Sequence, residues 1–315
     1  FNSFASEYTS SATKELDQFR EWKKQGFVSA NDPEPSRALR VANSVWKRDD
    51  ILADFTAKYR DKIGKCYAAE YFTFTERNAV EKINNWADEK TEGLIPKLLP
   101  ADYDTSELAV VLMNALYYKN SWIEPFPNHL TEDGDFTMKD GTVTTKTYMK
   151  NEERFAYYED KTTQLVVLPM KDNVYMAYVL GSTENLEDKL AGAEETMVRV
   201  TVPKIDLETS FEDKELVDFL KACGVSLAFD RVNADFSAMI DHDIWVDDII
   251  QKTRLKTDET GVEAAAVTAI MVKETCVIEK PENPKVFTAD RPFSFYIYTT
   301  VKDVNQLMFA GEIID

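Results

Sequence analysis

The side chains best suited to catalysis are few in this sequence. Its two histidines, His129 and His242, have no partner at the spacing of a metal site. Asp241 and Asp243 flank His242 and could orient it as a general base, but no candidate nucleophile accompanies them, so we interpret the segment as a solvated acidic turn. Neither a phosphate-binding glycine loop nor a dinucleotide fingerprint occurs. We therefore expect no enzymatic activity, no metal and no cofactor.

The cysteines also lack a pattern that would point to chemistry. Cys66, Cys223 and Cys276 are an odd number without paired spacing, so a disulfide framework is not indicated. There is no Asn-x-Ser/Thr acceptor, and the first residues lack the basic and apolar regions of a signal peptide. These features favour a cytoplasmic location and leave an extracellular one open.

Charge and composition exclude several classes of protein. The 315 residues carry 37 basic and 56 acidic side chains, a net charge of −19 that repels a phosphate backbone or an anionic bilayer. The longest apolar stretch, 108–118, is shorter than the roughly 18 residues that span a bilayer. Hydrophobic residues make up 44% of the chain, which is typical of a folded protein with a sizeable core. Neither nucleic acid nor a membrane is therefore expected as a partner.

One segment, 259–272, stands out because its side chains are small on both faces of an extended chain. At a period of two, one face carries Val262, Ala264, Ala266 and Thr268, and the other carries Glu263, Ala265 and Val267. Alanine and glutamate favour a short helix, which is the first interpretation. Small side chains would also let a strand slide between two others without overpacking, and this alternative stays open.

Helices and strands alternate along the chain without a regular β-α-β rhythm. Helical spacing of apolar residues predicts helices at 15–26, 78–90 and 212–223. Strand patterns occur at 108–118, 135–139 with 142–149 as a hairpin, 165–169 with 174–180 as a pair, 198–202, 245–257, 293–299 and 307–313. The apolar run 108–118 is predicted to be a central strand, and 280–285 a loop. We expect one large α+β domain, 1–315, with mainly antiparallel sheets.

Several segments, in order along the chain, resemble the serpin family. Residues 259–268, Glu-Thr-Gly-Val-Glu-Ala-Ala-Ala-Val-Thr, are similar to the serpin hinge, commonly Glu-Glu-Gly-Thr-Glu-Ala-Ala-Ala-Ala-Thr. Further matches lie at 39–46, 111–122, 202–204, 287–295 and 308–311. Around the hinge and Phe287, the sequence is most similar to the ovalbumin-like, largely intracellular branch of the family. The family has more residues before the match to Leu39 than the 38 found here, so the N-terminal part is expected to be short or incomplete.

The resemblance implies a peptidase inhibitor that acts as a suicide substrate. A serine or cysteine peptidase would cleave an exposed reactive-centre loop, about 259–286, and the freed hinge would insert into the central sheet of a metastable, monomeric fold. The implied hinge residues are Glu259, Gly261, Val262, Glu263, Ala264, Ala265, Ala266, Val267 and Thr268. The alternative is a non-inhibitory serpin that serves as a carrier, storage protein or chaperone.

The family's usual spacing places the scissile bond at Thr275–Cys276. Thr275 suits an elastase-like peptidase, whereas a shift of register to Lys273 suits a trypsin-like one.

Four further residues match the region where the sheet of the family opens: Lys204, Trp122, Asn114 and Gln251. Glu259 is expected to pair with Lys204. Gln251 stands where the family commonly has a histidine, and we expect it to form a hydrogen bond with Asn114.

Overall fold

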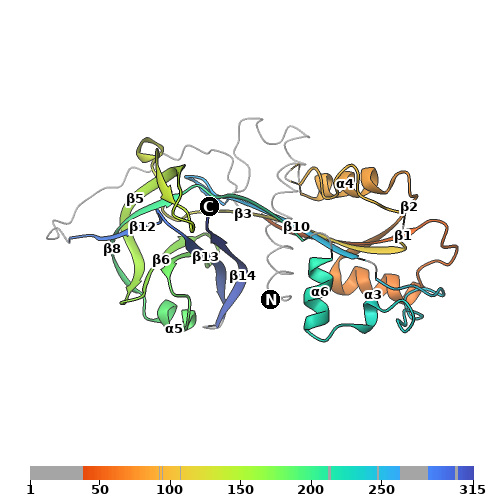
Figure 1. Cartoon of the computed structure of the whole chain (residues 1–315). Coiled ribbons are helices and arrows are strands. Elements are labelled where there is room, and N and C mark those ends of the chain that lie inside the picture. The colour runs from red at the N-terminus through yellow and green to blue at the C-terminus, as the bar shows by residue number, and fades with distance from the viewer. Residues whose placement is uncertain are drawn as a thin grey trace, which may run out of the picture. The chain divides into compact units, whose positions relative to one another are not determined.

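The computed structural model describes residues 38–91, 93, 95–106, 108–211, 214–246, 248–262, 283–301 and 304–315 (Figure 1). The described residues form two compact units. Unit 1 contains 118–206 and the residues from 255 onward, and unit 2 contains 39–117 and 207–254. The helix predicted at 15–26 lies outside the described residues.

Unit 2 is built on a sheet with the strand order β2-β1-β3-β10-β9. These strands are β1 (Ala38–Arg48), β2 (Ala69–Phe74), β3 (Val110–Ser121), β9 (Asp206–Phe211) and β10 (Asp248–Lys256), and the last residues of β3 and β10 belong to unit 1. The central place of β3 confirms the prediction for 108–118. Within this sheet the β1–β2 and β3–β10 pairs are parallel, which the sequence did not predict, whereas β11 (Gly261–Val262) pairs with β3 antiparallel. Parallel neighbours need a crossover, which helix α3 (Ala57–Tyr67) provides between β1 and β2.

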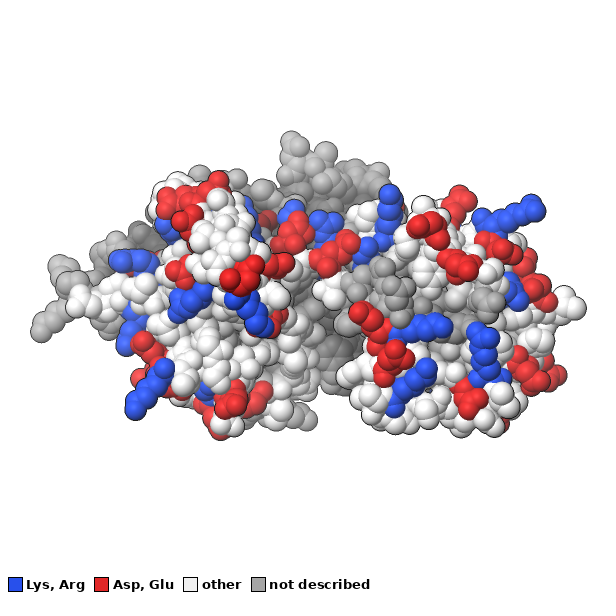
Figure 2. Space-filling view, in the orientation of Figure 1, with Lys and Arg blue, Asp and Glu red and all other residues white. Residues whose placement is uncertain are grey.

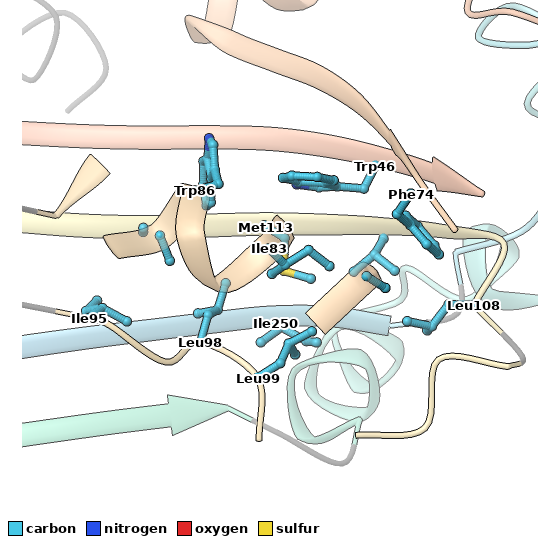
Figure 3. Close-up of a cluster of buried hydrophobic side chains, with 14 residues drawn as sticks. Trp46, Phe74, Ile83, Trp86, Ile95, Leu98, Leu99, Leu108, Met113 and Ile250 are labelled. Atoms are coloured by element: carbon cyan, nitrogen blue, oxygen red, sulfur yellow. The ribbon is translucent and has the colours of Figure 1, made fainter. Parts of the chain in front are cut away.

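Helices cover both faces of this sheet, with α4 (Ala79–Lys90) on one face and α3 and α6 (Glu215–Ala222) on the other (Figure 1). Helix α4 confirms the prediction at 78–90. Its Ile83 and Trp86 belong to one buried cluster with Met113 of β3 and Ile250 of β10 (Figure 3). Burial of such side chains stabilises the fold by roughly 1.5–3 kcal/mol each. A tightly packed layer therefore covers β3 and β10 on this face.

The opposite face of the sheet has its own core. Ile63 of α3 packs with Val45 of β1, Val110 of β3 and Ile240. The side chain of Thr56 caps α3 by accepting a hydrogen bond from the Tyr59 amide at 3.2 Å. The predicted helix at 212–223 is the shorter α6.

Unit 1 contains an eight-stranded sheet with the order β12-β8-β5-β6-β7-β13-β14, and β4 pairs with β5. The strands are β4 (Glu132–Thr137), β5 (Val143–Glu159), β6 (Thr163–Met170), β7 (Val174–Gly181), β8 (Glu194–Pro203), β12 (Lys285–Thr288), β13 (Phe293–Val301) and β14 (Val304–Ile313), with helix α5 at Leu186–Ala191. The β4–β5 hairpin and the antiparallel β6–β7 pair confirm two predictions. Lys285, placed in a loop by the sequence, begins β12.

The described part of the chain was searched for a membrane-spanning helix and for a metal site, neither of which the sequence predicts. No helix there is long and apolar enough to cross a membrane. No group of three or more His, Cys, Asp or Glu side chains within it could hold a metal ion. Cys66 and Cys223 are free and exposed, and Cys276 lies outside the described residues.

Candidate hinge and sheet-opening site

The first residues of the segment singled out in the sequence form a short strand in unit 1. This strand, β11 (Gly261–Val262), runs antiparallel to the end of β3, with Gly261 opposite Ser121 and Val262 opposite Asn120. Thr257, immediately after β10, makes an antiparallel bridge with Val262 as well. Val262 is fully buried between the ends of two strands. The helix favoured at 259–272 is therefore wrong for these two residues, which are extended.

Gly261 is required by the close approach of β11 to β3. A Cβ atom at this position would lie 2.0 Å from the carbonyl oxygen of Asn120 and 2.7 Å from Cα of Ser121. Both neighbours are backbone atoms, which cannot move aside as a flexible side chain can. Only glycine lets the chain enter here without displacing β3.

The turn that leads from β10 into β11 is organised by Asp258. Its Oδ1 accepts hydrogen bonds from the Thr260 amide at 2.7 Å, the Thr260 hydroxyl at 2.6 Å and the Gly261 amide at 3.1 Å. Aspartate commonly closes a turn in this way with the amide two residues on. The Asp258 carboxylate thus fixes the reversal that brings Val262 back beside Thr257.

The carbonyl oxygens of this turn are held by the segment that follows β3. The Trp122 amide donates to Thr260 O at 3.0 Å, the Trp122 indole Nε1 donates to Asp258 O at 2.9 Å, and the Phe126 amide donates to Glu259 O at 2.8 Å. The rings of Trp122 and Phe126 meet edge-on, with centroids 6.0 Å apart. Three successive carbonyls are therefore satisfied, as buried backbone requires.

Glu259 and Lys204 form the ion pair that the sequence predicts. Lys204 Nζ lies 2.7 Å from Glu259 Oε1, and the same oxygen accepts from Thr131 Oγ1 at 2.8 Å. The Glu259 side chain is 13% exposed and that of Lys204 38%. Partial burial acts to raise the pKa of Glu259, but hydrogen bonds from Lys204, from its own amide and from Thr131 outweigh it and lower that pKa.

Thr257 anchors the base of this turn to the link between β8 and β9. Its amide donates to Ile205 O at 2.8 Å, and its Oγ1 accepts from the Ile205 amide at 2.9 Å. Sequence reasoning missed Thr257, Asp258, Phe126 and Thr131. The Asp-x-Thr spacing of 258–260 could have indicated the turn, but the other three residues carry no local signal.

Asn114 and Gln251, both in unit 2, lie opposite each other on the parallel strands β3 and β10. The Asn114 amide nevertheless donates to Asn43 Oδ1 on β1 at 2.9 Å, and the Asn43 amide donates to Tyr67 O at 3.0 Å. The expected Asn114–Gln251 hydrogen bond does not occur among the described residues. Because β3 lies between β1 and β10, Asn114 has a neighbour on each side, and its amide bonds to the one on β1.

Other predicted site residues fall beyond the described part of the chain. These are Glu263, Ala264, Ala265, Ala266, Val267 and Thr268 of the hinge, and Lys273, Thr275 and Cys276 near the expected scissile bond. The described residues of the expected hinge are therefore its first ones, where a short strand pairs with the end of β3 and bridges to the residue after β10, beside the Glu259–Lys204 ion pair.

A profile of the family described as Serpin (serine protease inhibitor) matches residues 5–315. The chain belongs to the serpin family. The family, its fold class and the ovalbumin-like branch are as the sequence predicts. The description of this family names peptidase inhibitors and no catalytic activity.

Named relatives agree with this assignment. This serpin is 30% identical over 313 residues to Serpin B6 of Macaca fascicularis, covering 91% of this chain and 80% of the relative. It is 30% identical over 293 residues to the leukocyte elastase inhibitor of Equus caballus, covering 85% and 75%. Among solved structures, Serpin48 of the insect Tenebrio molitor matches with a TM-score of 0.73 and 26% identity, over 97% of this chain and 80% of that one.

Proposed function

We propose that this serpin inhibits a peptidase by a suicide mechanism, in which cleavage beyond Val262 lets the hinge continue β11 as a strand between β3 and β10. The observation that carries the proposal is the position of β11. It runs antiparallel to β3 and bridges to the residue that follows β10. The first step of insertion would therefore lengthen a strand that already exists.

The pairing of β3 with β10 supports this route. The two strands are parallel, with Asp248 opposite Val111 and Thr253 opposite Leu116. A strand entering between them antiparallel to both can exchange backbone hydrogen bonds on its two edges. If roughly a dozen such bonds form at about 0.5–1.5 kcal/mol each, insertion gains on the order of 10 kcal/mol before ordering costs. The uncleaved fold would then be the metastable one.

The composition of the hinge fits insertion rather than a static loop. Ala264, Ala266 and Thr268 share a face with the buried Val262 when the chain is extended. None of them is charged or bulky, so none would leave an unpaired charge inside the sheet. The non-inhibitory alternative, a carrier, storage protein or chaperone, is not favoured because the named relatives are peptidase inhibitors.

For the target, we propose a serine peptidase with a small, weakly polar specificity pocket. Thr275 would occupy that pocket, with cleavage at Thr275–Cys276. One relative is named a leukocyte elastase inhibitor, which supports this choice. A shift of register to Lys273 would instead indicate a trypsin-like enzyme, and a cysteine peptidase is the further possibility to be tested.

The experiment is incubation of the full chain with elastase, trypsin and papain, followed by denaturing gel electrophoresis. We expect a complex with elastase that survives boiling. Mass spectrometry of the released fragment should give a new N-terminus at Cys276, whereas an N-terminus at Glu274 would move the target to trypsin-like enzymes.

A pair of hinge variants separates insertion from simple binding. Ala264→Arg places a charge on the face shared with Val262, so the variant should be cleaved without trapping the enzyme. Glu263→Arg is the matched control, because Glu263 lies on the other face and is already charged, so this variant should still form the complex. Stable complexes with Ala264→Arg at full stoichiometry would rule out strand insertion as the mechanism.

A further inference from the structure

A cavity of about 340 Å³ opens beside β2, the edge strand of the sheet in unit 2. It lies in a different part of the chain from the hinge residues of the proposed function. Its lining comes from the end of β1, the loop before α3, helix α3, strand β2 and helix α4. Each of these elements is described, so the site can be built from its side chains.

The cavity is lined by three cationic side chains and one acidic one. Lys47, Arg60 and Lys82 supply the positive charges, and Asp54 supplies the negative one. The Asp54 side chain is 87% exposed and lies 3.9 Å from Lys47, so water screens most of its charge. On a chain with a net charge of −19 this local excess of positive charge is unusual, whereas on the face drawn in Figure 2 acidic and basic side chains are interspersed.

The cations are held in place by the backbone. The Lys47 side chain is only 5% exposed, and its Nζ donates to Ile51 O at 2.6 Å. Lys82 extends from α4 and donates to Thr73 O on β2 at 3.2 Å. The Arg60 guanidinium lies over the ring of Tyr71, 5.5 Å from its centroid, and has no carboxylate or carbonyl partner among the described residues. Its N–H donors are therefore available to a ligand.

Aromatic rings form the remaining wall. The rings of Phe55 and Tyr71 meet edge-on with centroids 6.1 Å apart. Phe72 stacks at 4.5 Å on Trp46, a core residue seen in Figure 3. Phe55 is buried and Phe72 packs against a core residue, so this part of the wall is formed before any ligand binds, while Tyr71 is 45% exposed and accessible to a ligand.

We propose that this cavity binds a small aromatic anion, such as an aryl phosphate or aryl sulfonate. The anionic group would contact Arg60 and Lys82, and the ring would lie against Phe55 and Tyr71. The volume suits a small molecule. A long polyanion is disfavoured, because beyond the cavity it would meet a strongly acidic chain.

The test is isothermal titration calorimetry of the full chain with phenyl phosphate at low salt, compared with inorganic phosphate and phenol. Phenyl phosphate should bind at least tenfold more tightly than either fragment, weaken as salt is added and raise the melting temperature. Arg60→Gln and Lys82→Gln should each weaken binding by about tenfold, since each removes a charge-assisted hydrogen bond. Lys62→Gln is the matched control: Lys62 is an exposed lysine of α3 outside the cavity, and its variant should bind as wild type.

Four results would overturn the proposal. They are the absence of phenyl phosphate binding to the wild type, equal affinity for inorganic phosphate, a loss in Lys62→Gln as large as in Arg60→Gln, and tighter binding of polyphosphate at the same residues. Peptidase inhibition by Arg60→Gln should equal that of wild type. A failure of the ligand site is therefore distinguishable from a failure of the inhibitory mechanism.

Discussion

At the residue scale, the hinge site depends on polar groups whose partners come from distant parts of the sequence. Glu259 needs Lys204 and Thr131, and Thr257 needs Ile205. Lys204 was found because it matches a family motif. Thr131 and Ile205 were not found, because neither belongs to a motif, and a single residue outside a motif carries no information about its partner in space.

The Glu259–Lys204 pair should stabilise the uncleaved fold in a pH-dependent way. The pKa of Glu259 is lower in the folded state than its ordinary value of 4.5. Its contribution is therefore fully present above that value and is lost as pH falls through the folded pKa. Glu259→Gln should lower stability by about 1 kcal/mol at neutral pH, a modest figure because Lys204 is partly exposed.

The measurement is the melting temperature of wild type and Glu259→Gln from about pH 7 to about pH 3. The difference between the two proteins should shrink below the ordinary pKa of glutamate. Mild heating at neutral pH should also give more polymer with the variant, because the hinge is less well held. If the difference in melting temperature stays constant down to the lowest pH, the carboxylate charge is not what stabilises the turn.

Tyr178 is a second residue whose effect can be predicted. Its side chain is fully buried in unit 1, and its hydroxyl interacts with the side chain of Thr257 without reaching the geometry of a hydrogen bond. A buried polar group left unpaired costs roughly 1–3 kcal/mol. Tyr178→Phe should therefore raise the stability of the uncleaved chain by about 1 kcal/mol, measured by chemical or thermal unfolding.

The control for this prediction is Tyr148→Phe. Tyr148 is also buried in unit 1, but its hydroxyl donates to Asp135 O at 2.9 Å. Removing that hydroxyl leaves an acceptor without its donor and should destabilise the chain. If both variants shift stability in the same direction, ring packing rather than hydrogen bonding governs the two sites.

At the element scale, most helices and strands follow from the sequence, and so do the β4–β5 and β6–β7 pairs joined by short turns, but the pairing of strands distant in sequence does not. The apolar run at 108–118 predicts a central strand because it is buried on both faces, and β3 is central. Nothing in a strand's own pattern states whether its neighbour runs parallel to it. The parallel pairs β1–β2 and β3–β10 were missed for this reason.

The segment from residue 259 shows where local patterns stop being informative. Alanine-rich sequence is compatible with a helix and with a strand, and intrinsic propensity favours the helix. Gly261 and Val262 are extended because they pair with Asn120 and Ser121 on β3. Contacts distant in sequence override the local preference. The small side chains at a period of two left a strand open as the alternative, and the resemblance to serpins favoured it.

Strand β11 can be tested directly through its glycine. Gly261→Ala forces a Cβ atom into the backbone of Asn120, so β11 must leave β3. We expect a loss of stability of about 2 kcal/mol or more and a larger fraction of inhibitor cleaved without trapping the peptidase. The measurements are the melting temperature and the stoichiometry of inhibition.

Gly64→Ala gives the matched control for that variant. Gly64 lies in helix α3, and apart from its chain neighbours and the backbone of its own helix nothing lies within 4 Å of the position its Cβ would take. Alanine is favoured over glycine inside a helix by roughly 0.5–1 kcal/mol, so this variant should be slightly more stable and inhibit normally. Normal stability and inhibition in Gly261→Ala would show that β11 is not part of the mechanism.

At the scale of the whole molecule, suicide inhibition by strand insertion requires that the uncleaved chain is not its most stable form. Cutting a loop ordinarily destabilises a folded protein, because the unfolded chain gains conformational freedom and the folded state is relieved of no strain. Here the cut would allow β11 to lengthen between β3 and β10, with a gain on the order of 10 kcal/mol before ordering costs.

Cleavage within 263–282 by a peptidase that is not trapped should therefore raise the melting temperature, by roughly 10 °C or more at about 2–4 °C per kcal/mol. Differential scanning calorimetry of the purified cleaved and intact chains would measure the shift. Ala264→Arg, cleaved in the same way, should show little or none of it, because a charged side chain cannot enter between the two strands without a partner. An equal rise in that variant would mean that the gain comes from somewhere other than insertion of the hinge.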